Sequence, residues 1–96
     1  MTNEIGNLRF TASPEATPSF HDDGLVILHT GKGRLFSSNR TGAQIWRGIE
    51  RQLPVEVIVQ QLSGEYQIPQ NIARAHTFDF LDQLQSHELV QRRAGQ

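Results

Sequence analysis

The stretch that decides the fold is GLVILHTGKGRLFSSNRTGAQIW, residues 24–46. Its first part, Gly24–Thr30, is almost entirely apolar, which predicts the central strand of a small sheet. Gly31-Lys32-Gly33 supplies the positive-φ positions of a tight hairpin turn, and Arg34–Ser38 is the returning strand. Asn39 then offers its side-chain oxygen as the N-cap of a helix. Because the hairpin runs directly into a helix, the outer edge of Arg34–Ser38 has no predicted partner.

Three helices are predicted after the hairpin. The first begins after Asn39 and places Ala43, Ile45, Trp46 and Ile49 on one apolar face, with a close packing contact expected at Gly48. The second begins at Pro54 and the third covers Gln70 to about His87. The apolar faces of these two helices are Val55, Ile58, Val59, Leu62 and Tyr66, and Ala73, Thr77, Phe80, Leu81 and Leu84.

The segments outside this region carry weaker patterns. Leu8–Ala12 alternates as a half-buried strand. Ser13–Ser19 contains Pro14 and Pro18, which lack amide donors and therefore predict a loop. Leu89-Val90 is a short extended piece. We expect one α+β domain over residues 8–90, a three-stranded antiparallel sheet followed by three helices, with flexible tails at residues 1–7 and 91–96.

Composition excludes several classes of function. Lys and Arg total nine and Asp and Glu ten, so the net charge of −1 argues against nucleic acid or a membrane as partner. The chain has no cysteine, which rules out disulfides, thiolate metal sites and cysteine catalysis. The N-terminus lacks the pattern of a signal peptide, and the longest apolar run, Leu25–Leu28, is too short to cross a membrane. We expect a soluble cytoplasmic protein.

No catalytic, metal or cofactor constellation is present in the sequence. His21, His29, His76 and His87 do not pair at helical spacing, so surface or rim histidines are preferred over a zinc site. The carboxylate pairs Asp22-Asp23 and Asp79/Asp82 are better explained as a solvated turn and a solvated helix face. The glycines around Lys32 do not form a phosphate-binding loop. The sequence therefore predicts a protein that is not an enzyme and has no cofactor.

Phe78 is the residue that fits the core least well. It is one position off the Thr77–Leu81 row and falls with polar neighbours at the border of the buried face. Two interpretations are open: a rim aromatic that covers a loop, or one wall of a hydrophobic groove between the third helix and the outer edge of Arg34–Ser38. Such a groove would take an extended peptide, with main-chain hydrogen bonds from the strand edge and specificity from side-chain pockets.

These residues resemble the PqqD-like family. The resemblance is carried by Gly24–Leu28, Gly33–Phe36 and Asn39–Trp46, whose N-x-T-G-A-x-I-W pattern is its most specific part. It continues through Val57–Tyr66 and Phe80–Val90, so that it covers about residues 20–90.

The resemblance implies a winged-helix-like fold and a role as a RiPP recognition element, a module of pathways that modify ribosomally made peptides. Such a module binds the leader segment of a precursor peptide, which adds antiparallel to the third strand and packs against the third helix. It then presents the peptide to a maturation enzyme. Stand-alone members of this size are similar to those of lasso-peptide pathways, where the partner is a leader peptidase; others serve radical-SAM enzymes.

Carried over by position, the resemblance also implies the binding residues. The docking edge is Arg34, Leu35, Phe36, Ser37 and Ser38, and the candidates for the opposite wall are Arg74, Phe78, Leu81, Asp82 and Gln85. The chain departs from the family pattern at Ser38, where Leu is usual, at Leu53 in place of a Thr cap, and at Glu88 in place of Gly. A hydroxyl at Ser38 should loosen the local packing or find a backbone partner.

A winged-helix DNA-binding regulator is the alternative, because three helices and a hairpin also describe that fold. It would need a basic recognition helix. The third helix carries Arg74 as its only Lys or Arg, against Asp79 and Asp82, which is a poor surface for phosphates. An unprotected edge strand also invites pairing with a second copy, so an edge-strand homodimer remains open.

Overall fold

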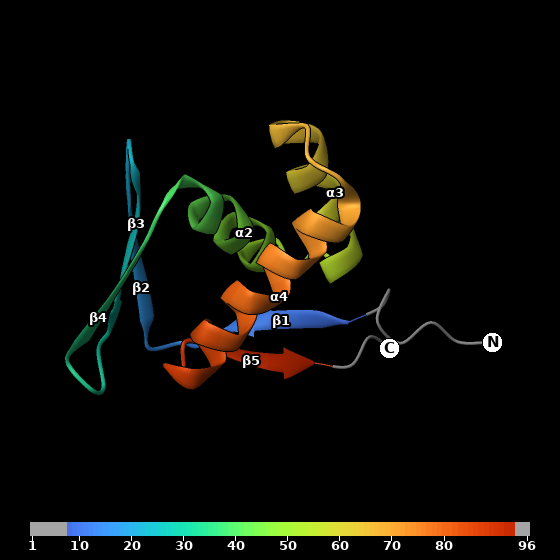
Figure 1. The fold of residues 1–96 in the computed structure, drawn as a ribbon. Coiled ribbons are helices and arrows are strands. Elements are labelled where there is room, and N and C mark those ends of the chain that lie inside the picture. The colour runs from blue at the N-terminus through green and yellow to red at the C-terminus, as the bar shows by residue number, and fades with distance from the viewer. Residues whose placement is uncertain (1–7, 94–96) are drawn as a thin grey trace.

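The structure, a computed structural model, describes residues 8–93 and confirms the α+β class (Figure 1). Sequence positions 1–7 and 94–96, expected to be tails, lie outside the described residues. The elements are β1 (Arg9–Ala12), β2 (Ala16–His21), β3 (Gly24–His29), β4 (Arg34–Ser38), α2 (Arg40–Glu50), α3 (Val55–Tyr66), α4 (Gln70–Ser86) and β5 (Val90–Arg93). Within this range no helix is long and apolar enough to cross a membrane.

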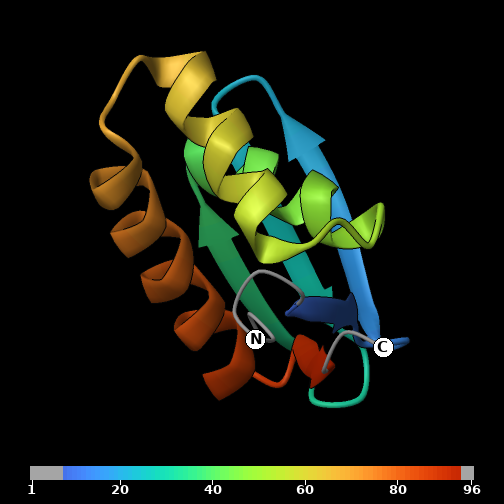
Figure 2. The ribbon, with the colours of Figure 1, turned by 90° about the vertical axis from the view of Figure 1, so that its right-hand side faces the viewer.

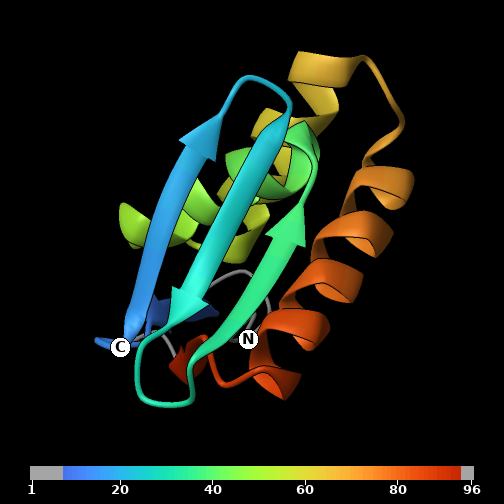
Figure 3. The same cartoon turned by 90° about the vertical axis from the view of Figure 1, so that its left-hand side faces the viewer.

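The three-stranded antiparallel sheet is confirmed, with the order β2-β3-β4 and β3 at its centre. The helices cover one face of this sheet, and its other face is open in Figure 3. On β3, Leu25 and Ile27 face the helices and are buried. Leu28 is on the open face and is 36% exposed. The strand is central because it has two neighbours, although only one of its faces is covered.

The prediction of a loop at Ser13–Ser19 was wrong, because β2 begins at Ala16. The bond from Thr30 N to Glu15 O (2.9 Å) flanks the pair Ala16↔His29. By the alternation of an antiparallel ladder, Ala16 and Pro18 both occupy non-hydrogen-bonded positions opposite β3. The missing amide of Pro18 therefore points away from β3, at the outer edge of the sheet, where proline is tolerated.

The other end of the chain also differs from expectation. Gln91–Arg93, predicted as part of a tail, belongs to β5, which pairs antiparallel with β1 in a separate two-stranded ribbon. The ribbon closes the core beneath the helices: Phe10 and Val90 are buried, and Val55 N donates to Leu8 O at 2.8 Å. β1 is thus not a member of the main sheet.

The helices agree closely with the predictions made from the sequence. Asn39 Oδ1 accepts the amide of Gly42 at 3.0 Å, which confirms the N-cap. Trp46 is fully buried, and Gly48 packs so tightly that a Cβ there would lie 2.7 Å from Ile58 Cγ1. The exception is Tyr66, predicted on the buried face of α3 but 40% exposed.

Candidate peptide groove

The outer edge of β4 has no strand beside it within residues 8–93. Since Ala16↔His29 is a non-hydrogen-bonded pair of the β2–β3 ladder, the backbone groups of His29 point toward β4, and Gly33 N donates to His29 O at 2.8 Å. The same alternation turns the groups of Phe36 toward β3. The amides and carbonyls of Leu35 and Ser37 then face outward, and the Leu35 side chain is 69% exposed.

Helix α4 runs beside this open edge, as Figures 2 and 3 both show. Aromatic side chains connect the strand with the helix and the turn that follows it. The ring of Phe36 lies 5.9 Å from the ring of Phe80 and 4.9 Å from that of His87, both measured between centroids. A groove with an open backbone edge on one side and a helix on the other therefore has an aromatic floor.

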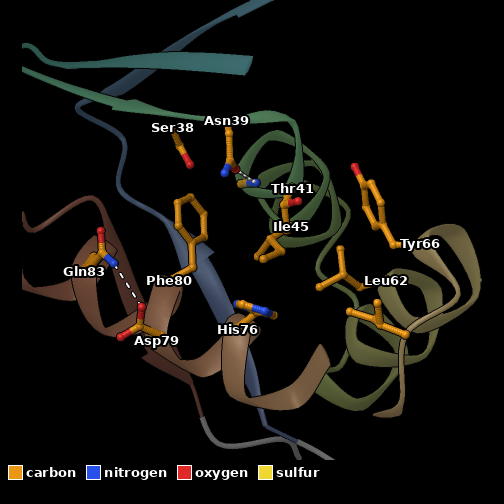
Figure 4. Close-up of a pocket in the computed structure, with 12 residues that line it drawn as sticks. Ser38, Asn39, Thr41, Ile45, Leu62, Tyr66, His76, Asp79, Phe80 and Gln83 are labelled. Carbon is orange, nitrogen blue, oxygen red and sulfur yellow. Dashed lines mark hydrogen bonds between the residues drawn. The ribbon is translucent and has the colours of Figure 1, made fainter. Parts of the chain in front are cut away.

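At the C-terminal end of β4 the groove opens into a pocket of about 510 Å³ (Figure 4). Its apolar surface comes from Ile45, Leu62 and Phe80, and its polar groups include Tyr66 and Asp79. The full lining is Ser38, Asn39, Thr41, Gly42, Ile45, Leu62, Tyr66, Ile68, His76, Asp79, Phe80 and Gln83. Such a mixture suits a bulky guest side chain that has a polar end.

Two small residues shape the mouth of this pocket. A Cβ on Gly42 would lie 2.0 Å from Ser38 Oγ and 2.9 Å from Phe80 Cε1, so only glycine fits there. Ser38, where we expected loosened packing or a backbone partner for the hydroxyl, is half-buried and lines the pocket. The approach of β4 to α2 thus depends on small side chains at both positions.

The predicted wall residues of α4 lie together on one side of that helix, and it is not the side that lines the pocket. Arg74 forms an ion pair with Glu56 of α3, Nη2 to Oε1 at 2.7 Å, and the hydrogen bond and charge of Glu56 raise the pKa of Arg74. Phe78 follows one turn later on the same side and packs against the core, and Leu81 is only 1% exposed. Gln85 lies further along this side, and Asp82 is exposed. None of these five lines the pocket beside β4.

Four other α4 residues line that pocket instead. His76, Asp79, Phe80 and Gln83 repeat at helical spacing, and Gln83 Nε2 donates to Asp79 Oδ2 at 3.2 Å. The sequence carried this signal, because a buried helix face has two polar borders. Periodicity alone does not say which border faces the strand.

The far end of the groove is held by charged contacts around the β3–β4 turn. Lys32 Nζ lies 2.6 Å from Glu88 Oε2, and this contact lowers the pKa of the Glu88 carboxyl. His29, expected at the surface or rim, is 7% exposed; its Nδ1 accepts the amide of Lys32 at 3.2 Å and lies 3.8 Å from Glu15 Oε1. The turn is thereby fixed to the residues that follow α4. No metal-ligating cluster of three or more His, Cys, Asp or Glu occurs in the described part of the chain.

These features define a small winged-helix-like α+β domain with an open sheet edge beside its last helix. The family model for coenzyme PQQ synthesis protein D (PqqD) matches residues 24–90, and the chain belongs to this family. The resemblance inferred from the sequence is thereby confirmed. A search of curated protein sequences finds no significant match.

Two solved structures are similar to the chain. One is TbiB1 in complex with the TbiA(beta) leader peptide: 28% identity, TM-score 0.79, covering 84% of this chain and 94% of that one. The other is lasso peptide synthetase B1 complexed with the leader peptide: 22% identity, TM-score 0.79, covering 86% and 98%. The second likeness, at 22% identity, supports the fold alone, and the first covers nearly all of the solved TbiB1 chain.

Proposed function

We propose that this protein binds the leader segment of a ribosomally synthesised precursor peptide as an added antiparallel strand on β4. The observation that carries the proposal is the open edge of β4 beside α4. In a chain with this edge, strand addition provides affinity through main-chain hydrogen bonds. Membership of the PqqD family and the likeness to a leader-bound TbiB1 support the same guest.

The geometry suggests how the guest is held. Leu35 and Ser37 offer two amides and two carbonyls to the added strand, while Phe36 lies on the floor. We propose Arg34, Leu35, Phe36, Ser37 and Ser38 as the docking edge, and His76, Asp79, Phe80 and Gln83 as the facing wall. Of the wall candidates from the sequence, Arg74, Phe78 and Leu81 are better placed to hold α4 against α3 and the core.

We further propose that the protein does no chemistry itself and delivers the bound peptide to a maturation enzyme in the cytoplasm. A leader peptidase of a lasso-peptide pathway is favoured, because this chain of 96 residues resembles the stand-alone family members of such pathways in size. A radical-SAM enzyme is the next candidate. The alternative of a DNA-binding regulator is not favoured, since the exposed surface of α4 presents Asp79 and Asp82 while its one arginine is paired with Glu56.

The test is a calorimetric titration with the leader peptide encoded beside this protein. Ser37→Pro removes an outward amide without removing a bond to β3, and Ser37→Ala keeps that amide. We expect Ser37→Pro to weaken binding about tenfold, the loss of roughly one hydrogen bond, and Ser37→Ala to bind as the parent does. Circular dichroism checks that both variants fold.

Two outcomes would contradict the proposal. One is equal affinity of the parent and Ser37→Pro for the leader. The other is no leader binding together with salt-dependent binding of duplex DNA, which would favour the winged-helix regulator.

A further inference from the structure

A second groove, of about 430 Å³, lies between α2 and α3. It shares no lining residue with the pocket beside β4. We name it the α2–α3 groove and define it by its lining residues, which are Gln44, Arg47, Gly48, Arg51, Gln60, Gln61, Gly64 and Glu65. A ligand in this groove and a peptide on β4 would not compete for the same side chains.

The α2 wall of this groove carries two arginines, Arg47 and Arg51. Arg47 and Arg51 are both exposed. Across residues 8–93, ion pairs within 4.0 Å join His29 with Glu15, Lys32 with Glu88 and Arg74 with Glu56, so no α2 arginine takes part. Glu65 is the one carboxylate in the lining. The groove therefore favours an anionic partner over a cationic one.

Arg47 is held in place without losing its charge. Its guanidinium carbon lies 4.0 Å from the centroid of the Phe20 ring on β2. Stacking on an aromatic face orients a guanidinium and leaves its N–H groups free to bind a carboxylate. Less conformational entropy is then lost when an anion binds.

No contact within the described part of the chain explains why residue 64 is a glycine. It lies inside α3, where glycine lowers helix stability relative to alanine. A Cβ at this position would meet nothing within 4 Å, and its φ is not in the left-handed region, so neither packing nor backbone conformation requires glycine. A missing side chain on an exposed groove floor is useful where another backbone approaches closely.

We propose that the α2–α3 groove docks an acidic helix of a partner protein, the enzyme that acts on the peptide held at β4. A helix is favoured over an extended segment because the backbones of α2 and α3 are already hydrogen-bonded within each helix and offer no strand edge. A protein is favoured over nucleic acid because two arginines beside Glu65 and several amides make few phosphate contacts. The identity of the partner as that enzyme rests on the proposed function; acidic-helix binding does not.

The probe is a synthetic helical peptide with glutamates at i, i+4 spacing, titrated into the ¹⁵N-labelled protein. We expect the amide resonances of Gly48 and Gly64 to shift. Arg47→Ala with Arg51→Ala should raise Kd by about tenfold or more, since two charge-assisted contacts are lost. The matched control is Arg40→Ala with Arg92→Ala, which removes the same charge outside the groove and should change Kd by no more than about twofold.

Gly64→Ala separates docking from folding. The substitution should raise Tm because alanine is the better helix former, yet it should weaken binding of the acidic peptide. An equal loss of affinity in both double variants, unchanged binding by Gly64→Ala, or tighter binding of duplex DNA at the same residues would each overturn the proposal. A leader titration run in parallel reports on β4 alone, so failure of leader binding would count against the proposed function and leave the acidic-helix result standing.

Discussion

At the scale of single residues, all three helices end in the same unusual way. Within two residues of each helix end, a residue that is not glycine has a positive φ, and the amide of the residue that follows it donates to the carbonyl five residues earlier. The three residues are Gln52 (φ 58°), Gln67 (φ 53°) and Glu88 (φ 59°). A side chain in this region costs roughly 1 kcal/mol relative to glycine. We expect Gln67→Gly to raise the free energy of unfolding in urea by about that amount, and a decrease would contradict this account.

Glu88 differs from the other two because its carboxylate contacts Lys32. Lys32 lowers the pKa of Glu88 in the folded state, so the contact contributes stability above the ordinary carboxyl pKa, and this stability is lost as the pH falls through the lowered pKa. Thermal unfolding at pH 7 and pH 3 tests this. Lys32→Gln should lower Tm at pH 7, and the difference in Tm from the parent should become smaller at pH 3, as Glu88 of the folded parent takes up a proton. The same Tm difference at both values would show that the contact does not matter.

The same substitution on each polar border of α4 tests which border faces the leader peptide. Gln83 and Gln85 are both exposed glutamines on this helix, but only Gln83 lines the pocket beside β4. Gln83→Trp should obstruct the groove and weaken leader binding about tenfold, the loss expected when one buried contact is blocked. Gln85→Trp should bind the leader as the parent does. The reverse pattern would favour the wall that includes Phe78 and Gln85.

At this scale the sequence predicted which residues are capped, buried or closely packed better than it predicted which side of a helix faces the sheet. The Asn39 cap, buried Trp46 and the close contact at Gly48 follow from local rules and are confirmed. The side of α4 that faces β4 depends on how the helix is placed in space. No spacing rule supplies that, so the position of Phe78 relative to the groove was not available from the sequence.

At the scale of elements, the two edges of the sheet are not equivalent. β4 presents outward amides at Leu35 and Ser37, whereas the outer edge of β2 lacks one amide at Pro18. This difference explains why a guest strand would pair with β4 rather than with β2. Pro18→Val restores the missing donor, and we expect it to produce concentration-dependent dimers in sedimentation velocity. Thr17→Val, on the same strand, is the control; a monomeric Pro18→Val would show that Pro18 does not protect this edge.

The elements that the sequence missed share a cause. β2 contains Pro18, and β5 is rich in polar residues, so neither carries the alternation or composition of a typical strand. Both form because a partner strand lies beside them, β3 in one case and β1 in the other. The hairpin and the three helices have strong local signals and were predicted nearly to their ends.

At the scale of the whole molecule, the β1–β5 ribbon joins segments from near the two ends of the chain. The family match at residues 24–90 omits β1 and nearly all of β5, yet Phe10 of β1 is 4% exposed in the common core. Truncating a buried Phe to Ala costs about 3–5 kcal/mol, a large share of the roughly 5–15 kcal/mol typical of a domain. Phe10→Ala should therefore lower the urea midpoint sharply, whereas Thr11→Ala, one residue along the same strand, should not.

This destabilised variant gives an independent measure of where the leader binds. If the peptide binds only the folded state, at a concentration of 100 Kd it stabilises that state by about 2.7 kcal/mol. Because Phe10 lines neither the pocket beside β4 nor the edge itself, Phe10→Ala should keep the parental Kd, and excess leader should restore most of the lost urea midpoint. Adding Ser37→Pro to Phe10→Ala should reduce that stabilisation to roughly half, about 1.4 kcal/mol, because a tenfold higher Kd leaves the same leader concentration at about 10 Kd. Recovery that is as large in the double variant as in Phe10→Ala would place the leader on another surface of the molecule.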